Sequence, residues 1–459
     1  MGKIVSVNPA TEEIYGELEE ASDSEIAEKV GNARRDRRWK EIDLNKRAEI
    51  ISGLIKLLER NKEKLARVMA EEMGKSLKEG RHEVDIAIRR VADFCRMIPG
   101  FIADDVLFES LDEKNVAVYE PVGSVAVISP WNAPIFLPLA MIVPALLCGN
   151  NVIWKPSKHT AFCGLKLGSL FDELKRNGLP DFAFQFIVGG ENVGRKLVES
   201  DVNMIALTGS ARAGKEVMSS AGRDLKRVVL ELGGKDPAIV LNDSDLDKAA
   251  AAIVKSSTMY TGQVCFAVER VYCLEEVYDK FVSKCVEETK KLRVGDPLDE
   301  EKDVGPFAAK FQRDLVLEHV KDAIVKGAKI LCGGHEIGGK GYFFAPGVIV
   351  NVNHSMKIMK EETFGPITCI MKVSGEDEAI ELANDSEYGL TASVWTSDLK
   401  RGELIARRLE AGTVEINRHG MSKAGCPWGG YKKSGIGRIY SKEGIREFCN
   451  VKHVWVVRS

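Results

Sequence analysis

The segment NMIALTGSARAGKEVMSSAG, residues 203–222, runs from an apolar stretch through a glycine-rich turn into a stretch with helical spacing. A second apolar stretch, RVVLEL at residues 227–232, follows shortly after it. Short apolar strands that alternate with helices are typical of a parallel, doubly wound sheet. Ligands of such a sheet bind at the carboxyl ends of its strands, where the turn TGS at residues 208–210 lies.

The alternation continues along the chain and predicts an α/β fold. A second block of strands and helices is predicted from about Lys235 to Gly430, whereas residues 22–100 have helical spacing. VAVYEPVGSVAVIS, residues 116–129, is expected to form two strands around a Pro-Val-Gly turn. The other predicted strands are NVIWKP (151–156), FAFQFIV (182–188), PAIVL (237–241), ITCIMKV (367–373), SVWTS (393–397) and the terminal run VKHVWVVRS (451–459).

The turn at 208–210 also has the opening of a nucleotide-binding P-loop, because Gly209 is followed after four residues by Gly214 and Lys215. A P-loop needs Ser or Thr after the lysine, since that hydroxyl holds the magnesium that bridges the phosphates. Glu216 stands there instead, so the sequence does not predict nucleotide hydrolysis. A glycine-rich turn before a helix is still suited to another phosphate.

The composition is that of an ordinary globular protein with room for two or three domains, at 459 residues and a formal net charge of −3. Because cations and anions are interspersed, neither nucleic acid nor a membrane is an expected partner. The N-terminus lacks a signal peptide and no stretch has the length of a membrane helix, so we expect a cytoplasmic protein. Ten cysteines without a C-x-x-C pair and dispersed histidines predict neither disulfides nor a metal site.

Three residues are candidates for chemistry. Cys265, in TGQVCF, follows a glycine and a glutamine where the backbone can turn sharply and expose a nucleophilic thiol. Glu231 ends an apolar strand, where partial desolvation would raise its pKa toward that of a general base. Asn132 lies between prolines and has an amide that can donate to an oxyanion. Taken singly, each also fits an ordinary role: a buried thiol, a capping or ion-paired acid, a turn residue.

Taken together, the motifs resemble the aldehyde dehydrogenase superfamily over essentially the whole chain. The separation between Glu231 and Cys265 is also similar to that of the family. Seven motifs occur in the family's order: PWNAP (130–134), KPS (155–157), LTGS (207–210), LELGGK (230–235), GQVC (262–265), EETFGPI (361–367) and PWGGYKKSGIGR (427–438).

The resemblance implies a non-acylating, NAD(P)-dependent oxidation. Cys265 would attack the aldehyde carbonyl, while the Asn132 side chain and the Cys265 backbone N–H stabilise the oxyanion. The thiohemiacetal would give hydride to the nicotinamide and leave a thioester. Glu231 would then activate the water that hydrolyses it. A CoA-acylating semialdehyde dehydrogenase is the alternative, but relatives of that kind lack the glutamate in LELGG. A catalytically silent relative would have lost Cys265 or Glu231.

The resemblance also implies where the dinucleotide binds. The LTGS turn and the helix from Ala211 would present N–H groups to the pyrophosphate, and Glu362 would hold the nicotinamide ribose. NAD-preferring relatives often read K-P-S-E where this chain has KPSKHT, so Lys158 predicts a preference for NADP with NAD still usable. The expected cofactor-binding residues are Trp131, Lys155, Pro156, Ser157, Lys158, Gly190, Gly194, Thr208, Gly209, Ser210, Gly214, Leu232, Glu362 and Phe364.

Residues near the nucleophile and in the loop before the last motif would contact the substrate: Phe266, Arg418 and His419. Because Phe266 is bulky, we expect a small hydroxyaldehyde such as lactaldehyde or glyceraldehyde, or a semialdehyde such as succinic semialdehyde. A guanidinium at Arg418 suits a carboxylate or phosphate, although an arginine in a loop is as often simply solvated.

The resemblance divides the chain into three parts. Residues 1–104 and 122–234 would form the dinucleotide-binding domain and residues 235–430 the catalytic domain. Residues 105–121 and 431–459 would form a small β oligomerisation element, and a homodimer or homotetramer is expected.

Overall fold

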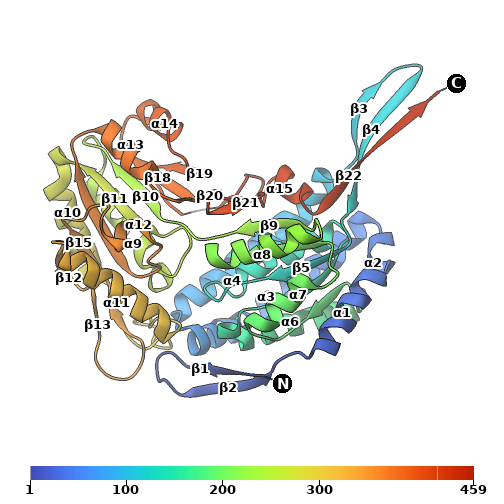
Figure 1. Cartoon of the computed structure of the whole chain (residues 1–459), viewed down its shortest axis with the longest axis horizontal. Helices are drawn as coiled ribbons and strands as arrows, with labels where there is room; N and C mark the ends of the chain where they lie inside the picture. Colours follow the sequence, from blue (N-terminus) through green and yellow to red (C-terminus); the bar gives the residue numbers. More distant parts are fainter. Residues whose placement is uncertain (1, 421, 459) are drawn as a thin grey trace.

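The computed structural model of the chain describes residues 2–420 and 422–458 and has two lobes, each built on a largely parallel sheet (Figure 1). The strand orders are β21-β9-β8-β5-β6-β7 and β12-β15-β16-β11-β10-β18-β19. In each sheet only one edge strand, β21 or β12, pairs antiparallel with its neighbour. The first sheet changes direction between β5 and β8, and the crevice at that switch point is the expected place for a ligand.

The first lobe begins with a hairpin and a helical region and continues into the first sheet. Its N-terminal elements are β1 (Lys3–Val7), β2 (Ile14–Glu19), α1 (Asp23–Arg35), α2 (Arg38–Glu41), α3 (Leu44–Met73) and α4 (Leu77–Phe101). The sheet and its helices follow as β5 (Ser124–Ile128), α5 (Phe136–Leu147), β6 (Asn151–Lys155), η1 (Lys158–Thr160), α6 (Ala161–Arg176), β7 (Phe184–Phe186), α7 (Glu191–Glu199), β8 (Met204–Thr208), α8 (Ala211–Arg223) and β9 (Arg227–Glu231).

The second lobe holds the seven-stranded sheet and its covering helices. Its first half comprises β10 (Asp236–Val240), α9 (Leu246–Thr258), η2 (Met259–Gly262), β11 (Val268–Leu274), α10 (Glu275–Lys290), α11 (Lys310–Val325), β12 (Lys329–Cys332), β13 (His335–Glu336) and β14 (Phe344–Ala345). Its second half comprises β15 (Gly347–Val350), α12 (Lys357–Lys360), β16 (Ile367–Val373), α13 (Glu376–Asn384), β17 (Tyr388–Gly389), β18 (Thr391–Trp395), α14 (Leu399–Ala406) and β19 (Thr413–Ile416).

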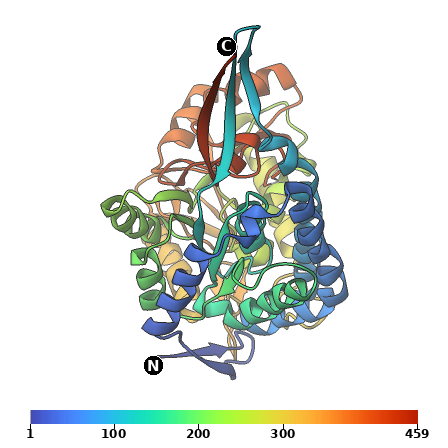
Figure 2. The same cartoon turned by 90° about the vertical axis from the view of Figure 1, so that its right-hand side faces the viewer.

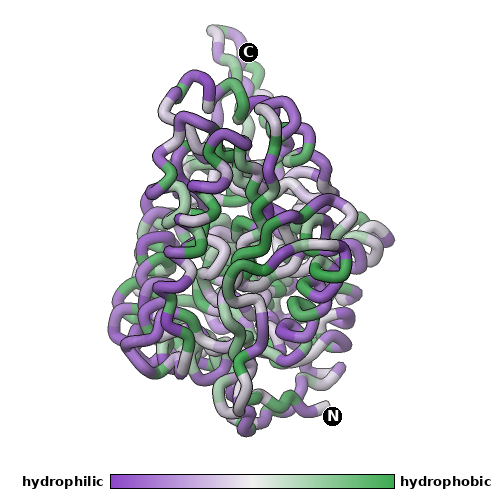
Figure 3. The backbone as a smooth tube through the Cα atoms, turned by 90° about the vertical axis from the view of Figure 1, so that its left-hand side faces the viewer, coloured by the Kyte–Doolittle hydropathy of each residue, from purple (hydrophilic) through white to green (hydrophobic). Residues whose placement is uncertain are grey.

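Both faces of the first sheet are buried, as is usual for a sheet of mainly parallel strands. Along β5, Val125 and Val127 pack into the core under the long helices, whereas Ala126 packs into a separate core on the other face. The same alternation holds in β10, where Ile239 and its neighbours face different clusters. Hydrophobic stretches accordingly lie toward the middle of the chain trace and hydrophilic ones around its outline (Figure 3). No helix of the described residues is long and apolar enough to span a bilayer.

The strands predicted at 116–129 do not pair with each other, so the expected hairpin is wrong. β4 (Glu113–Pro121) pairs with β3 (Asp105–Glu109) and with β22 (Cys449–Val457), which makes a separate three-stranded flap. β5 instead joins the first sheet beside β6 and β8. The flap projects from the body of the molecule (Figure 2), and the terminal strand finds its partner within the same chain.

The C-terminal segment pairs with strands of both lobes before it enters the flap. β20 (Tyr431–Lys432) pairs with β17 of the second lobe, and β21 (Gly435–Ile436) pairs with β9. α15 (Lys442–Arg446) then leads into β22. The boundary predicted at 431 is therefore too early for the strands of the flap. Gly435 lies directly opposite Glu231, so this segment closes over the end of β9.

Candidate active site

Cys265 lies in a tightly constrained turn between η2 and β11. Tyr260 and Thr261 have left-handed φ values of 53° and 61°, which non-glycine residues rarely adopt, and Gly262 follows with φ 73°. Side chains hold this backbone: the Tyr260 N–H donates to Glu79 Oε1 (2.8 Å), and the Thr261 hydroxyl donates to the carbonyl of Gly305 (3.0 Å). The turn is fixed from several sides, so the thiol has a defined position.

Asn132 follows β5 and reaches the turn that carries the cysteine. Its side-chain N–H donates to the backbone carbonyl of Gln263 at 2.9 Å, and the residue is buried. Just beyond it, the N–H groups of Ile135 and Phe136 donate to Glu83 Oε1 at 2.8 and 2.9 Å. An amide NH₂ has two N–H donors, so this bond to the turn leaves the second one available to an oxyanion.

Glu231 ends β9 and is almost completely buried. Its Oε1 has no hydrogen-bond partner within the described residues. Burial raises the pKa of this carboxyl well above its usual range, against the opposing charge of Arg438 and a hydrogen bond from Trp428. A buried carboxyl with a raised pKa and a free oxygen is suited to exchange a proton with a small molecule.

Cys265 and Glu231 line one small cavity, together with Thr208, Trp428 and Tyr440. It has about 20 Å³ of room for water centres, which is enough for about one water molecule. Burial, reinforced by neighbouring carboxylates, raises the pKa of the Cys265 thiol above its usual range. Burial thus favours the protonated form of both groups, and the cavity that they line has the size of the water that a thioester hydrolysis consumes.

The carboxyl end of β6 supplies the predicted cofactor lysines. Lys155 is buried and donates to the carbonyls of Pro156 (2.9 Å) and Gly189 (2.8 Å), and burial lowers its pKa to about 8. Ser157 caps η1 by accepting the His159 N–H at 3.3 Å. Lys158 is exposed at the same edge. Two of the expected side chains are therefore engaged with the protein, and Lys158 is the one that faces solvent.

The N-termini of α7 and α8 lie side by side at this edge, linked by an ion pair of 3.9 Å between Arg212 and Glu191. One expectation for the LTGS turn is wrong: the Gly209 N–H donates to the carbonyl of Glu231 at 3.0 Å, so it is not free for a phosphate. Ser210 accepts the Ala213 N–H at 3.2 Å as the N-cap of α8. The free N–H groups belong to the first turn of α8 instead.

The predicted glycines are spacers. A Cβ on Gly214 would lie 2.5 Å from the Leu232 side chain, and one on Gly194 would lie 3.0 Å from Cε of Lys155. Gly190 is the N-cap of α7. Side chains at these positions would push α7 and α8 away from the sheet, so the glycines keep the two helix N-termini close to the strand ends.

The residues expected at the nicotinamide end of the cofactor, Glu362 and Phe364, lie in the second lobe. Glu362 Oε1 accepts the Gly234 N–H at 3.1 Å, and burial raises its pKa to about 8. The Phe364 N–H donates to Glu269 Oε1 at 2.7 Å, and its ring meets Trp131 edge-on with centroids 5.6 Å apart. Adjacent helix N-termini, an exposed lysine and an acid at the far end fit the phosphates and ribose of a dinucleotide.

Glu20 is a residue of this edge that the sequence did not single out. It follows β2, and its Oε1 accepts the Gly190 N–H at 2.6 Å. A Cβ on Gly190 would lie 2.9 Å from this oxygen and 3.7 Å from Cδ of Lys158, so acid and lysine flank the same glycine. The only signal in the sequence was an acid directly after a strand near the chain start.

The predicted substrate residues separate into two groups. His419 Nε2 lies 2.8 Å from the carbonyl of Phe266, and burial lowers the pKa of this imidazole to about 4. The Phe266 ring meets Trp428 edge-on at 5.9 Å. Arg418 is exposed and forms an ion pair with Glu415 at 3.2 Å. The structure thus brings Phe266 and His419 together behind the cysteine, while Arg418 lies on the solvent side.

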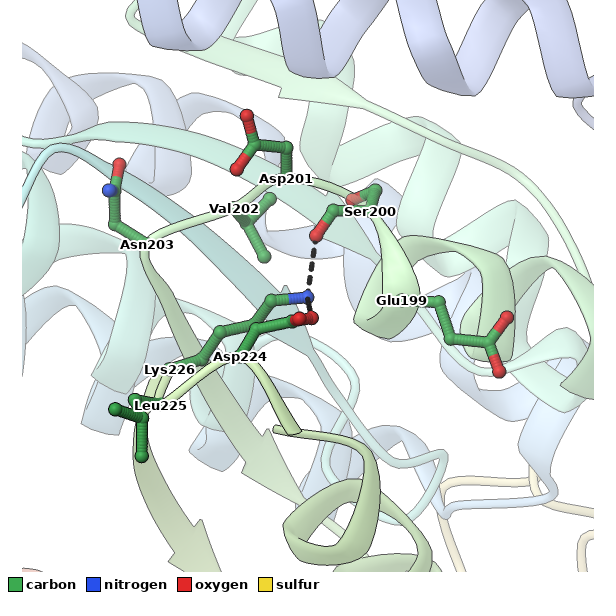
Figure 4. Close-up of a pocket in the computed structure, with 8 residues that line it drawn as sticks. All are labelled: Glu199, Ser200, Asp201, Val202, Asn203, Asp224, Leu225 and Lys226. Atoms are coloured by element: carbon green, nitrogen blue, oxygen red, sulfur yellow. Dashed lines mark hydrogen bonds and ion pairs between the residues drawn. The ribbon is translucent and has the colours of Figure 1, made fainter. Parts of the chain in front are cut away.

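A larger cavity of about 410 Å³ lies at the opposite edge of the first sheet, at the start of β8 and β9 (Figure 4). Lys226 reaches across it, donating to the carbonyls of Val198 (2.8 Å) and Ser200 (2.7 Å) and pairing with Asp224 at 3.2 Å. Its position at the amino ends of the strands and its internally paired lysine separate it from the chemistry. No group of three or more His, Cys, Asp or Glu among the described residues could hold a metal.

Comparison with known proteins agrees with this geometry. The sequence model of the Aldehyde dehydrogenase family matches residues 2–454. The chain belongs to the aldehyde dehydrogenase family. It is 36% identical over 457 residues to an aldehyde dehydrogenase of Paenarthrobacter nicotinovorans, covering 98% of this chain and 99% of that protein. It is also 36% identical over 454 residues to the succinate semialdehyde dehydrogenase [NAD(P)+] Sad of Escherichia coli K12, covering 98% and 97%.

Solved structures give the same answer for the fold. The crystal structure of an E. coli NADP-dependent enzyme superposes with a TM-score of 0.95 at 33% identity, covering all of this chain and 95% of that one. The α/β aldehyde dehydrogenase fold predicted from the sequence is thus confirmed. The chain is an NAD(P)-dependent enzyme of the aldehyde dehydrogenase family that oxidises an aldehyde.

The turn before the cysteine yields a stability prediction. A Cβ on Gly262 would overlap the carbonyl carbon of Gly365, and its φ of 73° disfavours any side chain. Gly262→Ala should therefore lower the free energy of unfolding by about 2–4 kcal/mol and impair activity, measured by urea unfolding. Gly222→Ala is the control, because a Cβ there would have no neighbour within 4 Å. Equal stability of the two variants would contradict this account.

Proposed function

We propose that this enzyme converts a small aldehyde to its carboxylic acid through a thioester on Cys265 that Glu231 hydrolyses. The observation that carries the proposal is the shared cavity, which has the thiol and the carboxyl in one wall and room for about one water. Without Glu231 the thioester would await a different acceptor such as CoA. The buried glutamate with a free oxygen therefore favours hydrolysis over the acylating alternative.

The proposed catalytic residues act at successive steps of the reaction. Cys265, once deprotonated, adds to the carbonyl carbon, and the second Asn132 N–H and the Cys265 backbone N–H donate to the oxyanion. When bound, the dinucleotide supplies a hydride acceptor. Glu231 then takes a proton from the water that attacks the thioester and releases the acid. Because burial raises the pKa of Glu231 well above its usual range, its basic carboxylate form becomes more populated as the pH rises, so deacylation should speed up with rising pH.

We further propose a small substrate, either a hydroxyaldehyde such as lactaldehyde or glyceraldehyde, or a semialdehyde such as succinic semialdehyde. Phe266, which packs against Trp428 beside the cysteine, leaves little space for a bulky chain. Arg418 remains a candidate for an acidic tail, although an anion would compete there with Glu415. The name of the Sad relative includes succinate semialdehyde and agrees with the second class.

For the cofactor we propose a preference for NADP with NAD usable. The exposed Lys158 would attract a ribose 2′-phosphate, and its stem already lies against Gly190 at the start of α7. Glu20 contacts the same glycine and would favour NAD instead, because a carboxylate repels a phosphate and accepts hydrogen bonds from ribose hydroxyls. The pair would make the preference partial.

We also propose that the enzyme assembles as a homodimer or a dimer of dimers through the flap formed by β3, β4 and β22. Both of its edge strands are unpaired on one side, and Leu107, Val451 and Val457 are 62%, 62% and 70% exposed. A second copy would cover these apolar side chains.

The first sheet and its helices would bind the dinucleotide, and the second lobe would carry the cysteine. All ten cysteines are free, which suits a cytoplasmic enzyme.

Two active-site variants should fail at different steps. Cys265→Ala should show no cofactor reduction, because no covalent adduct forms. Glu231→Gln should keep a first-turnover burst while its steady-state rate falls by about 100-fold or more, since the water lacks its base. Stopped-flow absorbance and intact-mass detection of the acyl-enzyme measure this. Cys332→Ala, a cysteine of β12, is the matched control. Full steady-state activity in either variant would refute the assignment.

Two variants at the carboxyl end of β6 and at the neighbouring Glu20 test the proposed preference for NADP. Lys158→Glu should lower the ratio of kcat/KM for NADP to that for NAD by about ten- to a hundredfold, because a charged hydrogen bond is replaced by repulsion. Glu20→Gln should raise the same ratio, since the amide still accepts the Gly190 N–H but has no charge. Fluorescence titration of both dinucleotides gives the binding constants independently. Glu19→Gln is the control. A wild type that strongly prefers NAD would contradict the proposal.

Assembly is tested on the flap. Leu107→Glu combined with Val451→Glu should shift the enzyme toward monomer at micromolar concentration, because two charges would enter the apolar contact. Sedimentation velocity reports the change. Leu225→Glu, at a residue 92% exposed before β9, is the control that adds a charge elsewhere. A wild type that sediments as a stable monomer would overturn the proposal.

A further inference from the structure

Arg90 of α4 places an incompletely bonded guanidinium inside the first lobe. The residue is only 6% exposed. Its Nη2 donates to the carbonyl and hydroxyl oxygens of Ser422 at 3.0 and 2.8 Å. Its Nη1 is buried and has no hydrogen-bond partner among the described residues. It costs free energy to bury a donor of a charged group without a hydrogen bond. A ligand that accepts a hydrogen bond from Nη1 would remove this cost.

No carboxylate of the described residues forms an ion pair with Arg90. Its charge lies instead over aromatic rings, 4.0 Å from the Tyr440 centroid and 5.7 Å from that of Phe136. Lys75, another buried cation of the same lobe, is instead paired directly with Glu83. Ring faces compensate a cation only in part, and the guanidinium therefore retains attraction for an anion.

The position of Arg90 connects it to the reaction centre. The Tyr440 ring faces the guanidinium, and Tyr440 also lines the cavity of Cys265 and Glu231. Phe136 lies just beyond Asn132 in the chain, and Ser422 follows His419, which contacts the carbonyl of Phe266. Residues that neighbour the catalytic ones in the chain or in the cavity thus meet around Arg90.

We propose that Arg90 and Ser422 bind the terminal carboxylate of the substrate, so that the enzyme acts on short semialdehydes in preference to neutral hydroxyaldehydes. One carboxylate oxygen would accept from Nη1 and the other from the Ser422 hydroxyl, whose oxygen already accepts from Nη2. This inference rests on the aldehyde oxidation proposed above and names its substrate class. It assigns to Arg90 the role that the sequence suggested for Arg418.

Electrostatics of the surroundings favour an anionic tail. Burial raises the pKa of Glu231 well above its usual range, which weakens the repulsion of a carboxylate that enters the cavity. Arg418 is already paired with Glu415 and exposed to solvent, where an ion pair contributes little. A hydroxyl tail would offer Nη1 an acceptor but no charge, and would leave the buried cation uncompensated.

The test compares succinic semialdehyde with butanal, which has the same chain length and no carboxylate. The wild type should prefer the semialdehyde. Arg90→Met should lower the ratio of the two kcat/KM values by about ten- to a hundredfold, mainly through the KM of the semialdehyde. Arg90→Lys should retain part of the preference. Arg89→Met, at the exposed neighbouring residue, should leave the ratio unchanged.

A binding measurement keeps the inference testable if a variant loses activity. Succinate should raise the melting temperature of the wild type, and it should raise that of Ser422→Ala by a smaller amount. Butyramide should raise the melting temperature of neither protein. Equal loss of both substrates in Arg90→Met with unchanged succinate binding would overturn the proposal, as would a wild type that uses butanal equally well or prefers glyceraldehyde 3-phosphate. Failure of the wild type on every aldehyde would instead refute the proposed oxidation.

Discussion

The buried ion pair between Lys75 and Glu83 is the constraint on which the active site depends. Glu83 accepts the first two N–H groups of α5 and so fixes the segment that carries Asn132. Lys75 lies 3.4 Å from the centroid of the Tyr260 ring, in the turn that carries Cys265. One pair therefore sets the nucleophile and its oxyanion donor against each other. Removal of either partner would leave a charge buried alone, which costs far more than the pair contributes.

The second lobe repeats this device at the cofactor. Lys235 and Glu269 form a buried pair, and Glu269 also accepts the N–H groups of Thr363 and Phe364 at 2.8 and 2.7 Å. The two groups proposed to react are held differently, because Cys265 and Glu231 form no such ion pair within the described residues and burial raises their pKa values. Fixed charges hold the loops, whereas burial favours the neutral form of the two reactive groups.

Sequence patterns predicted the strands of the two sheets better than they predicted strand partners or burial. Apolar periodicity identifies a strand such as β4, but it does not say that its partner is β22 at the far end of the chain. The residues of the family motifs meet at one edge because parallel strands end there. Arg90 was missed because its burial comes from the loop that returns after residue 417. Its signal was present, since it occupies the buried stripe of α4 with Glu83, Ala87 and Phe94.

The same reasoning explains why bulk charge says little about the ligands. A net charge of −3 excludes a large positive field, yet both proposed ligands of this enzyme are anionic. At physiological ionic strength a charge acts over about 8 Å, so a single cation next to a ligand influences its binding more than the net charge of the protein does. Lys158 lies at the cofactor edge and remains exposed, which suits a phosphate that must exchange at every turnover. Arg90 is buried behind aromatic rings, where a carboxylate meets a far stronger field. Affinity for the cofactor and selection of the aldehyde are thereby assigned to separate cations.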